Sequence, residues 1–175
     1  MNIEDAVIIS TARAWDGAWI TWFNAPGLTR GIEPGQFVML HCSAERTEPM
    51  FARAFSYYRV EGDRFAICYA EVGQGTRWLS TQPRGTAVRT YGPLGNGFHL
   101  PEAPFNLLLI GGGAGIAPLV ETAWQAVAEG HHVVAMMGAR GEATLLPANE
   151  WPKEVEYVVV TEDGSAGPKG FVTQH

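Results

Sequence analysis

The stretch Leu107–Leu119, LLLIGGGAGIAPL, constrains the fold of this chain more than any other. An uncharged apolar run, Asn106–Ile110, leads directly into three consecutive glycines, and such a run is typical of a parallel strand that is covered on both faces. Beyond the glycines, apolar residues recur at helical spacing, and they are Ile116, Leu119, Val120, Ala123, Trp124, Val127 and Ala128. The sequence therefore predicts a strand, a tight glycine turn and an amphipathic helix in direct succession.

Two more strands are predicted after this helix. Pro118 suits the first turn of the helix and Gly130 suits its end. The apolar runs His132–Met137 and Glu156–Val160 follow, so the second half predicts a doubly wound parallel sheet built on a strand–helix–strand unit. Three parallel strands leave an open edge, which isolated domains usually avoid. We therefore expect this sheet to be incomplete, because the sequence is a fragment or because a partner completes the sheet.

The first hundred residues have a different rhythm, in which short strands alternate with turn residues. Six strands are expected, at Ala6–Arg13, Ala18–Phe23, Gln36–Cys42, Ala54–Val60, Arg64–Val72 and Thr86–Tyr91. We expect the fourth to pair with the fifth across the turn Glu61-Gly62-Asp63, and we expect one short helix at Gly75–Ser80. This pattern predicts a small antiparallel barrel or sandwich, and we expect the six-stranded antiparallel barrel.

The rhythm changes at the segment Pro101–Pro104, where we place a domain boundary. The prediction is an antiparallel β-barrel over residues 1–101 and the N-terminal part of an α/β domain over residues 102–175. With 46% apolar and 17% charged residues, both halves can form a buried core.

Charge and composition exclude several classes of protein. A net charge of −6 without a run of Lys or Arg argues against a nucleic-acid or anionic-membrane surface. The sequence shows no membrane span and no export signal. Cys42 and Cys68 lie in apolar runs, so we expect buried thiols in a reducing cytoplasm. Two cysteines cannot alone form an all-cysteine iron–sulfur or zinc site, and the histidines show no metal-ligand spacing, so no metal site is predicted in this chain.

The glycine turn itself has two interpretations. It lies where a doubly wound fold binds phosphate, at a helix N-terminus with unpaired N–H groups. It does not match the G-x-G-x-x-G fingerprint, however, because that spacing from Gly111 ends on Ile116 and from Gly113 ends on Pro118. Close helix–strand packing or a positive φ would explain the glycines equally well, and the stretch alone leaves both interpretations open.

Three other motifs are ambiguous when each is taken alone. In RAFSYY, Arg53–Tyr58, alternation places Arg53 and Phe55 on one face and Ser56 on the other; the arginine could hold a pyrophosphate or only face solvent. In EVGQGTRWL, Glu71–Leu79, the glycines could bind phosphate or form a helix N-cap. In YGPLGNGF, Tyr91–Phe98, the glycines form a linker or, as Phe98 suggests, a packed loop.

The order of these motifs resembles that of the ferredoxin–NADP reductase superfamily. Within it, GPLGNGF, IGGGAGIAPL and TEDGSAGPKGFVT are similar to the electron-transfer subunits of NAD-dependent, B-type dihydroorotate dehydrogenase. The resemblance extends from about Gly35 to Thr173. It implies a flavoprotein that moves electrons between NAD(H) and a partner oxidoreductase, here the catalytic dihydroorotate dehydrogenase subunit of pyrimidine biosynthesis.

The resemblance also implies roles for individual residues. Ser56 would lie near the reactive edge of the flavin, and no protein acid or base is obligatory. The residues implied to bind FAD are Arg53, Ala54, Phe55, Ser56, Tyr69, Gly73, Gly75 and Thr76. Those implied to bind NAD(H) are Gly112, Gly113, Ala114, Gly115, Ile116, Pro118, Arg140, Thr161, Asp163, Gly164 and the adjacent Ser165.

The chain departs from the family at its C-terminal end. It has no four-cysteine stretch for a [2Fe–2S] cluster and no Cys-Gly-Pro segment to close the nicotinamide pocket. We expect FAD binding, weak NAD(H) binding, a cluster only in a longer chain, and a homodimer or hetero-oligomer. Arg140 could meet a 2′-phosphate or could be a solvated loop arginine, and the resemblance favours NAD. The alternatives are a hydrogenase- or sulfide-linked reductase subunit of the same superfamily, or a scaffold that has lost its cofactor.

Overall fold

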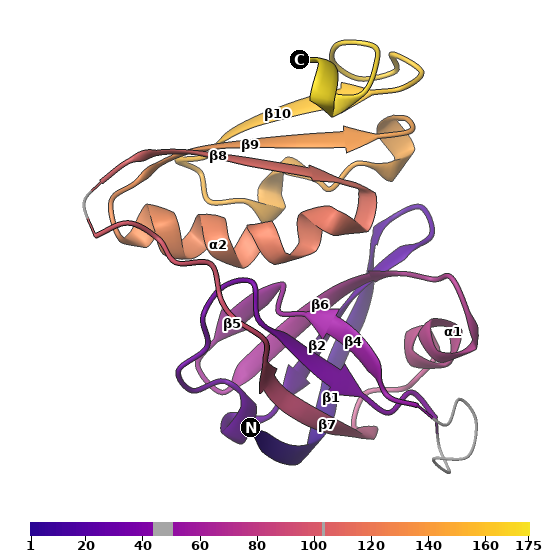
Figure 1. Ribbon diagram of the computed structural model, residues 1–175. Coiled ribbons are helices and arrows are strands. Elements are labelled where there is room, and N and C mark those ends of the chain that lie inside the picture. Colours follow the sequence, from indigo (N-terminus) through magenta and orange to yellow (C-terminus); the bar gives the residue numbers. More distant parts are fainter. Residues whose placement is uncertain (44–50, 103) are drawn as a thin grey trace.

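The computed structural model describes residues 1–43, 51–102 and 104–175, so Ala103 of the predicted boundary segment lies outside the described residues. The chain is arranged in three layers: an antiparallel sheet, the helix α2 (Ala117–Ala128) and a parallel sheet (Figure 1). The strands of the first sheet all precede residue 101 and those of the second all follow it. No helix among the described residues has the length and apolar character needed to cross a membrane.

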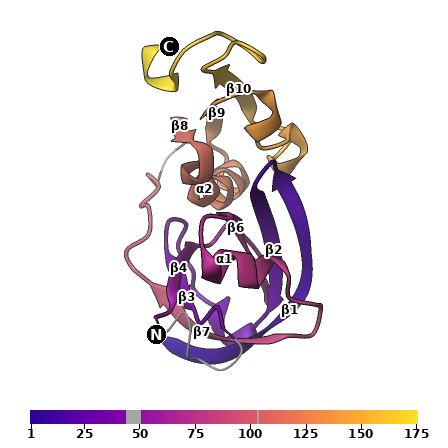
Figure 2. The ribbon, with the colours of Figure 1, turned by 90° about the vertical axis from the view of Figure 1, so that its right-hand side faces the viewer.

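The antiparallel sheet has the strand order β4-β3-β7-β1-β2-β6-β5. Its strands are β1 (Asn2–Trp15), β2 (Ala18–Asn24), β3 (Phe37–Leu40), β4 (Arg53–Ser56), β5 (Arg59–Glu61), β6 (Arg64–Ala70) and β7 (Ala87–Leu94). The sheet curves so that the edge strand β4 lies against β6 (Figure 2). There the rings of Phe55 and Tyr69 meet edge to face with centroids 5.6 Å apart. The short helix α1 (Gln74–Ser80) follows β6, close to its predicted position.

Within the described residues the sheet has seven strands where six were predicted, because the predicted strand Ala54–Val60 divides into β4 and β5. Only β5 pairs with β6, across the predicted turn, whereas β4 pairs with β3. Between them, Tyr57 and Tyr58 are both buried. Tyr57 and Tyr58 belong to different buried clusters, as successive residues on opposite sides of a sheet can. The break is in the backbone pairing: the N–H of Tyr57 donates to the Gln36 carbonyl at 3.2 Å, whereas that of Tyr58 donates to the Ala66 carbonyl of β6 at 2.8 Å.

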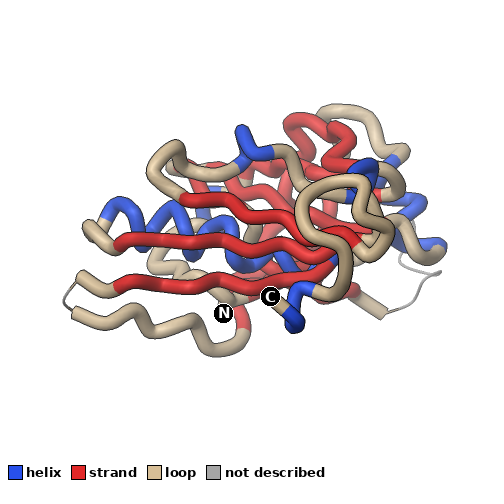
Figure 3. Tube along the Cα trace, turned by 90° about the horizontal axis from the view of Figure 1, so that it is seen from above, coloured by secondary structure: helices blue, strands red, loops and turns tan. Residues whose placement is uncertain are grey.

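The parallel sheet has the order β10-β9-β8, formed by β8 (Asn106–Gly112), β9 (His132–Ala139) and β10 (Glu156–Thr161). A 3-10 turn, η2 (Gly113–Ile116), joins β8 to α2, and Gly130 follows α2 with a φ of 87°. The predicted order of strand, glycine turn and helix is therefore confirmed, as is the antiparallel-then-α/β fold class. Figure 3 shows the sheet from the side opposite α2.

The expectation that β8 is covered on both faces is wrong. Helix α2 covers the face that carries Leu107 and Leu109, which pack against the buried cluster. On the other face, Leu108 is 57% exposed and Ile110 is 48% exposed. An apolar run identifies a strand but not the number of its covered faces, since coverage depends on which elements pack on it.

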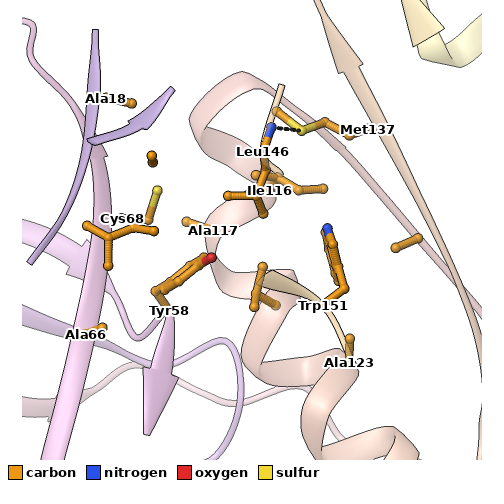
Figure 4. Packing of buried hydrophobic residues seen from close by; sticks show 14 of the residues in the cluster. Ala18, Tyr58, Ala66, Cys68, Ile116, Ala117, Ala123, Met137, Leu146 and Trp151 are labelled. Atoms are coloured by element: carbon orange, nitrogen blue, oxygen red, sulfur yellow. Dashed lines mark hydrogen bonds between the residues drawn. The ribbon is translucent and has the colours of Figure 1, made fainter. Parts of the chain in front are cut away.

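A buried apolar cluster joins the two sheets through α2 (Figure 4). Ala18, Tyr58, Ala66 and Cys68 come from the antiparallel sheet, and they face Ile116, Ala117, Val120 and Ala123 at the start and along one side of the helix. Small side chains on both sides allow the helix to approach the strands closely. Cys42 and Cys68 are both free and buried, which confirms the prediction for the thiols.

The glycine-rich loop that ends β7 packs against the loop before β3, as Phe98 suggested. The backbone N–H of Phe98 donates to the carbonyl of Pro34 at 2.6 Å, and the ring lies against Gly35, where a Cβ atom would be 2.9 Å from it. Gln36 Nε2 also donates to the carbonyl of Gly95 at 3.1 Å. The segment is therefore an ordered part of the fold and not a loose linker.

A polar contact between β5 and α2 accompanies the apolar cluster. Glu121 Oε2 accepts the backbone N–H of Val60 at 2.9 Å and Arg59 Nη1 at 3.3 Å. The guanidinium of Arg59 also lies 3.9 Å from the ring centroid of Trp124. The side chains of Arg59 and Glu121 are only 14% and 15% exposed. Burial raises the pKa of Glu121 in spite of these donors.

This contact predicts a pH-dependent contribution to stability. Because the pKa of Glu121 is higher in the folded protein, its contribution is full below the unfolded-state pKa and is lost as the pH rises through the folded-state value. Glu121→Gln can still accept the N–H of Val60 but cannot titrate, so lowering the pH from 7 to about 5 should favour the wild type relative to this variant. Urea unfolding of both proteins at each pH measures the difference.

The matched change Glu121→Ala should cost about 1–3 kcal/mol at either pH, since it removes the acceptor of a buried backbone N–H. If the wild type and Glu121→Gln have the same pH dependence, the assigned effect of burial on Glu121 is wrong.

Candidate functional site

Two neighbouring cavities lie where the two sheets meet. The first, here the edge-strand cavity, has a volume of about 480 Å³ and is bordered by β4, the end of β6 and the start of α1. The second, here the strand-end cavity, has a volume of about 580 Å³ and lies at the carboxyl ends of β8 and β9. Both are lined by Ala70, Val72 and Ala114. The two cavities therefore adjoin, and ligands bound in them would lie next to each other.

Four consecutive residues of β4 line the edge-strand cavity: Arg53, Ala54, Phe55 and Ser56. Successive side chains point to opposite faces of a strand, so side chains on one face could supply only every second residue. Since all four residues line the cavity, the backbone edge of β4 itself borders it. This is possible because β4 is an edge strand that pairs only with β3. The structure thus brings Ser56 into the same cavity as Arg53, although alternation had placed them on opposite faces.

The side chains of this strand differ in their surroundings. Arg53 is exposed, and its Nη1 donates to the carbonyl of Phe51 at 2.8 Å. Phe55 is buried against Tyr69, which also lines the cavity. The hydroxyl of Tyr69 forms a hydrogen bond with Thr21 at 3.1 Å, so its polar end is already partnered within the sheet. Burial raises the pKa of Tyr69 to about 12, which keeps the phenol neutral at physiological pH.

The loop before α1 supplies backbone donors to the same cavity. Gly73, Gln74, Gly75 and Thr76 all line it, and the first intrahelical bond runs from Arg77 N–H to the Gly73 carbonyl at 2.9 Å. The N–H groups of the first helical turn precede that bond and are suited to an anion. The hydroxyl of Thr76 instead serves the loop: it accepts the N–H groups of Val72 and Gly73, at 3.0 and 3.1 Å, and donates to the Gly73 carbonyl.

Glu71 holds this loop in place. Its Oε2 accepts Trp19 Nε1 at 3.1 Å and Ser80 Oγ at 3.0 Å, and its N–H donates to the Gly17 carbonyl at 2.8 Å. The hydrogen bond from Ser80 is the main reason why the pKa of Glu71 lies below its usual value. The neighbouring Val72 is 84% exposed and lines both cavities.

Different positions of the turn Gly111–Gly115 require glycine for different structural reasons. A Cβ atom on Gly111 would lie 2.9–3.1 Å from Ile116, so this residue permits the close packing of strand and helix. Gly113 has a φ of 50°, in the left-handed region. Gly112, Gly113 and Ala114 line the strand-end cavity, whereas Gly115, Ile116 and Pro118 are not among the described residues that line it. The packing and positive-φ interpretation is therefore confirmed for Gly111 and Gly113, whereas phosphate binding by the glycines that line the cavity stays a prediction.

The ends of the other two parallel strands border the strand-end cavity from the opposite side. Gly138 and Ala139 end β9 and line the cavity together with Arg140, which follows that strand, and with Glu162, which follows β10. Thr161 is buried, with its hydroxyl donating to the Ala166 carbonyl at 2.8 Å, and it is not among the described lining residues.

Asp163 and Gly164 are likewise outside the set of described lining residues. The Asp163 carboxylate accepts the N–H of Ser165 at 2.8 Å and its hydroxyl at 2.6 Å, which lowers the pKa of Asp163. Ser165 Oγ in turn accepts the N–H of Glu142 at 2.8 Å. These residues fix the loops around the cavity to each other.

Several lining residues were not among those predicted to bind NAD(H), although some of them lie in the motif TEDGSAGPKGFVT. Glu162 lies between two residues that were predicted, and Gly170–Thr173 reach the cavity only because the chain turns back after β10. Trp15 comes from the antiparallel sheet, far away in the sequence. No pattern within one half of the chain could have indicated a contribution across the junction.

The residues present fit two nucleotide cofactors. Both volumes lie within the range of about 300–1,000 Å³ that is usual for ligand pockets. Gly73 has an extended φ of −163°, and a Cβ atom there would meet no protein atom within 4 Å, so neither strain nor internal packing requires this glycine. It leaves the backbone open to a ligand. No group of three or more His, Cys, Asp or Glu side chains suited to a metal occurs among the described residues.

Comparisons with known proteins agree with this arrangement. The electron transfer subunit of dihydroorotate dehydrogenase B (NAD(+)) from Bacillus cereus (strain B4264) is 38% identical over 145 residues, covering 81% of this chain and 56% of that protein. The corresponding subunit from Desulforamulus reducens is 34% identical over 176 residues, covering 99% of this chain and 67% of that protein. This chain thus spans about half to two thirds of the length of these curated relatives. No protein-family model matches the chain.

Solved structures share the fold over nearly the whole chain. An NADH-dependent reduced ferredoxin–NADP oxidoreductase has a TM-score of 0.84 and 26% identity, covering 97% of this chain and 60% of that chain. The ferredoxin reductase of carbazole 1,9a-dioxygenase has a TM-score of 0.85 at 22% identity, covering 99% and 55%. The fold is therefore that of the ferredoxin–NADP reductases, and by its sequence the chain belongs to the family of dihydroorotate dehydrogenase B electron transfer subunits.

Proposed function

We propose that this chain binds FAD in the edge-strand cavity and NAD(H) in the strand-end cavity, and that it relays electrons between NAD(H) and a partner flavoprotein. The observation that carries the proposal is the shared wall of Ala70, Val72 and Ala114, since it brings ligands of the two cavities next to each other. Hydride transfer requires two rings at close range in a site that excludes water, and the cofactors themselves supply the chemistry.

In this proposal the chain binds and orients the flavin. The guanidinium of Arg53 pairs with the pyrophosphate, and the first N–H groups of α1 bind its oxygens. Phe55 and Tyr69 form an apolar wall, and Ser56, which lines the same cavity, would lie near the reactive edge of the flavin. Tyr57 lies deeper and is used by the fold, because its hydroxyl donates to the Leu28 carbonyl at 2.7 Å.

The strand-end cavity holds the nicotinamide nucleotide. Gly112 and Gly113 let its phosphates approach the backbone at the start of the η2–α2 segment. Glu162 and Arg140 border the same cavity with opposite charges. A carboxylate accepts hydrogen bonds from a ribose diol and repels a 2′-phosphate, so Glu162 favours NAD(H), whereas Arg140 alone would favour NADP(H).

The names of the relatives support a partner for the proposed electron transfer. They are electron transfer subunits of dihydroorotate dehydrogenase B, so the partner that we propose is the catalytic dihydroorotate dehydrogenase subunit, in a hetero-oligomer. The reaction then belongs to pyrimidine biosynthesis. An iron–sulfur cluster is proposed only for a longer chain.

The central test is flavin binding and reduction. Purified protein should retain FAD after gel filtration, and NADH at saturating concentration under anaerobic conditions should bleach the visible flavin absorbance. A chemical reductant serves as the positive control for bleaching. Protein that takes up no FAD even when it is added in excess would favour the cofactor-free scaffold, and flavin that only the chemical reductant bleaches would disprove the nicotinamide assignment.

Arg53→Ala should weaken FAD binding by about ten- to a hundred-fold, because it removes a charged hydrogen-bond donor to the pyrophosphate. The matched control is Arg64→Ala, since Arg64 is a half-exposed arginine of β6 that pairs with Glu61 and does not line either cavity. Fluorescence titration of FAD into each apoprotein gives the dissociation constants. Equal losses in the two variants would contradict the role of Arg53.

The wild type should be reduced faster by NADH than by NADPH, and Glu162→Gln should lower this preference by about ten-fold, because it removes one like-charge repulsion. Stopped-flow rates of flavin bleaching with each nucleotide measure the preference. Glu142→Gln is the control, since Glu142 is an exposed carboxylate of the adjoining loop that does not line the cavity. An unchanged preference in Glu162→Gln would remove Glu162 from cofactor discrimination.

A further inference from the structure

Trp15 lies at the end of β1, where the strand departs from regular pairing. Arg13 pairs with Trp19, but Trp15 pairs with Ala18, so β1 has one residue more than β2 between these two pairs. Such an irregularity is a β-bulge, which changes the direction of the side chains that follow it and is frequent beside active sites.

The bulge brings two successive residues to the same side. Ala14 is 8% exposed and belongs to the buried cluster between the two sheets, and Trp15 packs against that same cluster. In a regular strand Trp15 would point away from it. The irregular pairing is thus what turns the indole toward the junction between the sheets.

The hairpin that carries Trp15 is attached to the other half of the chain. The N–H of Asp16 donates to the carbonyl of Ala143 at 3.0 Å, in the loop that follows β9. This bond holds the hairpin beside Thr144 and the end of β9, and Trp15 lines the strand-end cavity together with them. The indole is therefore a fixed part of the cavity wall.

The rest of this wall is mostly small. Gly112, Gly113 and Ala114 form one side, and Gly138 and Ala139 form another. Among the described residues that line the cavity, the aromatic ones are Trp15 and Phe171, and Phe171 is 58% exposed. Trp15 is the half-buried aromatic surface that the cavity offers to a flat ligand.

We propose that Trp15 is the stacking platform for a planar heteroaromatic base of the nucleotide bound in the strand-end cavity. The inference rests on the proposed function in one respect, which is that a nicotinamide nucleotide occupies this cavity. Such a nucleotide has two flat rings, adenine and nicotinamide, and stacking chemistry is common to both. A residue of the antiparallel sheet would thereby contribute directly to a site built on the parallel sheet.

The test is equilibrium binding to FAD-loaded protein, measured by calorimetry with NAD⁺, AMP and NMN in separate titrations. Trp15→Leu keeps an apolar side chain but removes the flat ring, so NAD⁺ should bind about ten-fold or more weakly. Trp15→Phe should restore most of the affinity. The matched control is Trp22→Leu, because Trp22 packs against the same cluster but lines neither cavity, and NAD⁺ affinity should not change.

The shorter ligands identify the base. A loss confined to AMP assigns Trp15 to adenine, and a loss confined to NMN assigns it to nicotinamide. Tm and FAD content show whether Trp15→Leu still folds. If it does not, the quenching of tryptophan fluorescence by NAD⁺ decides: the wild type and Trp22→Phe should be quenched, and Trp15→Phe should lose most of this signal.

The outcomes separate this inference from the proposed function. Wild-type protein that binds NAD⁺ together with a folded Trp15→Leu that binds it equally well overturns the role of Trp15 and leaves the proposed function standing. Wild-type protein that binds none of the three ligands overturns both. Equal quenching in Trp15→Phe and Trp22→Phe would also reject Trp15 as the platform.

Discussion

The packing of α2 between two sheets is the constraint on which the rest of the structure depends. The helix buries Val120, Ala123 and Ala126, together with Ile116 just before it, and the same cluster continues into Tyr58, Ala66 and Cys68 of the antiparallel sheet. Burial of apolar area at a close-packed junction is the main source of stability for such an arrangement. Because α2 begins immediately after the glycine turn, its docking also brings Ala114 to the wall of both cavities.

The apolar cluster holds the two sheets together, and polar contacts fix their relative orientation. Tyr58 donates to Glu150 at 2.8 Å, and Glu121 accepts the N–H of Val60 at 2.9 Å. Each joins a residue of the antiparallel sheet to one that follows residue 101. Hydrogen bonds are directional and an unmade buried one is costly, so these contacts select one orientation of the two sheets. The spacing of the two cavities depends on that orientation.

The candidate site follows from this geometry more than from any single motif. Arg53–Ser56, Gly73–Thr76 and Gly112–Ala114 come from three separate segments, yet they border two cavities with a common wall. Some motif residues serve the fold instead. Gly111 makes room for Ile116, the Thr76 hydroxyl is used within its own loop, and Asp163 fixes Ser165. Each motif thus contains two kinds of residue: some line a cavity, and others hold the backbone of those residues in position.

The sequence by itself determined the fold class and the glycine turn with its helix, since these depend on local periodicity and on turn residues. The segments that border the edge-strand cavity were indicated by the order of the motifs and the family resemblance, because each motif alone was ambiguous. The sequence could not indicate that Ala54–Val60 divides into two strands, that Leu108 and Ile110 are exposed, or that Trp15 and Glu162 line the strand-end cavity. Those features depend on contacts between residues far apart in the chain. Local preference does not encode such contacts, and only the docking of α2 against both sheets decided them.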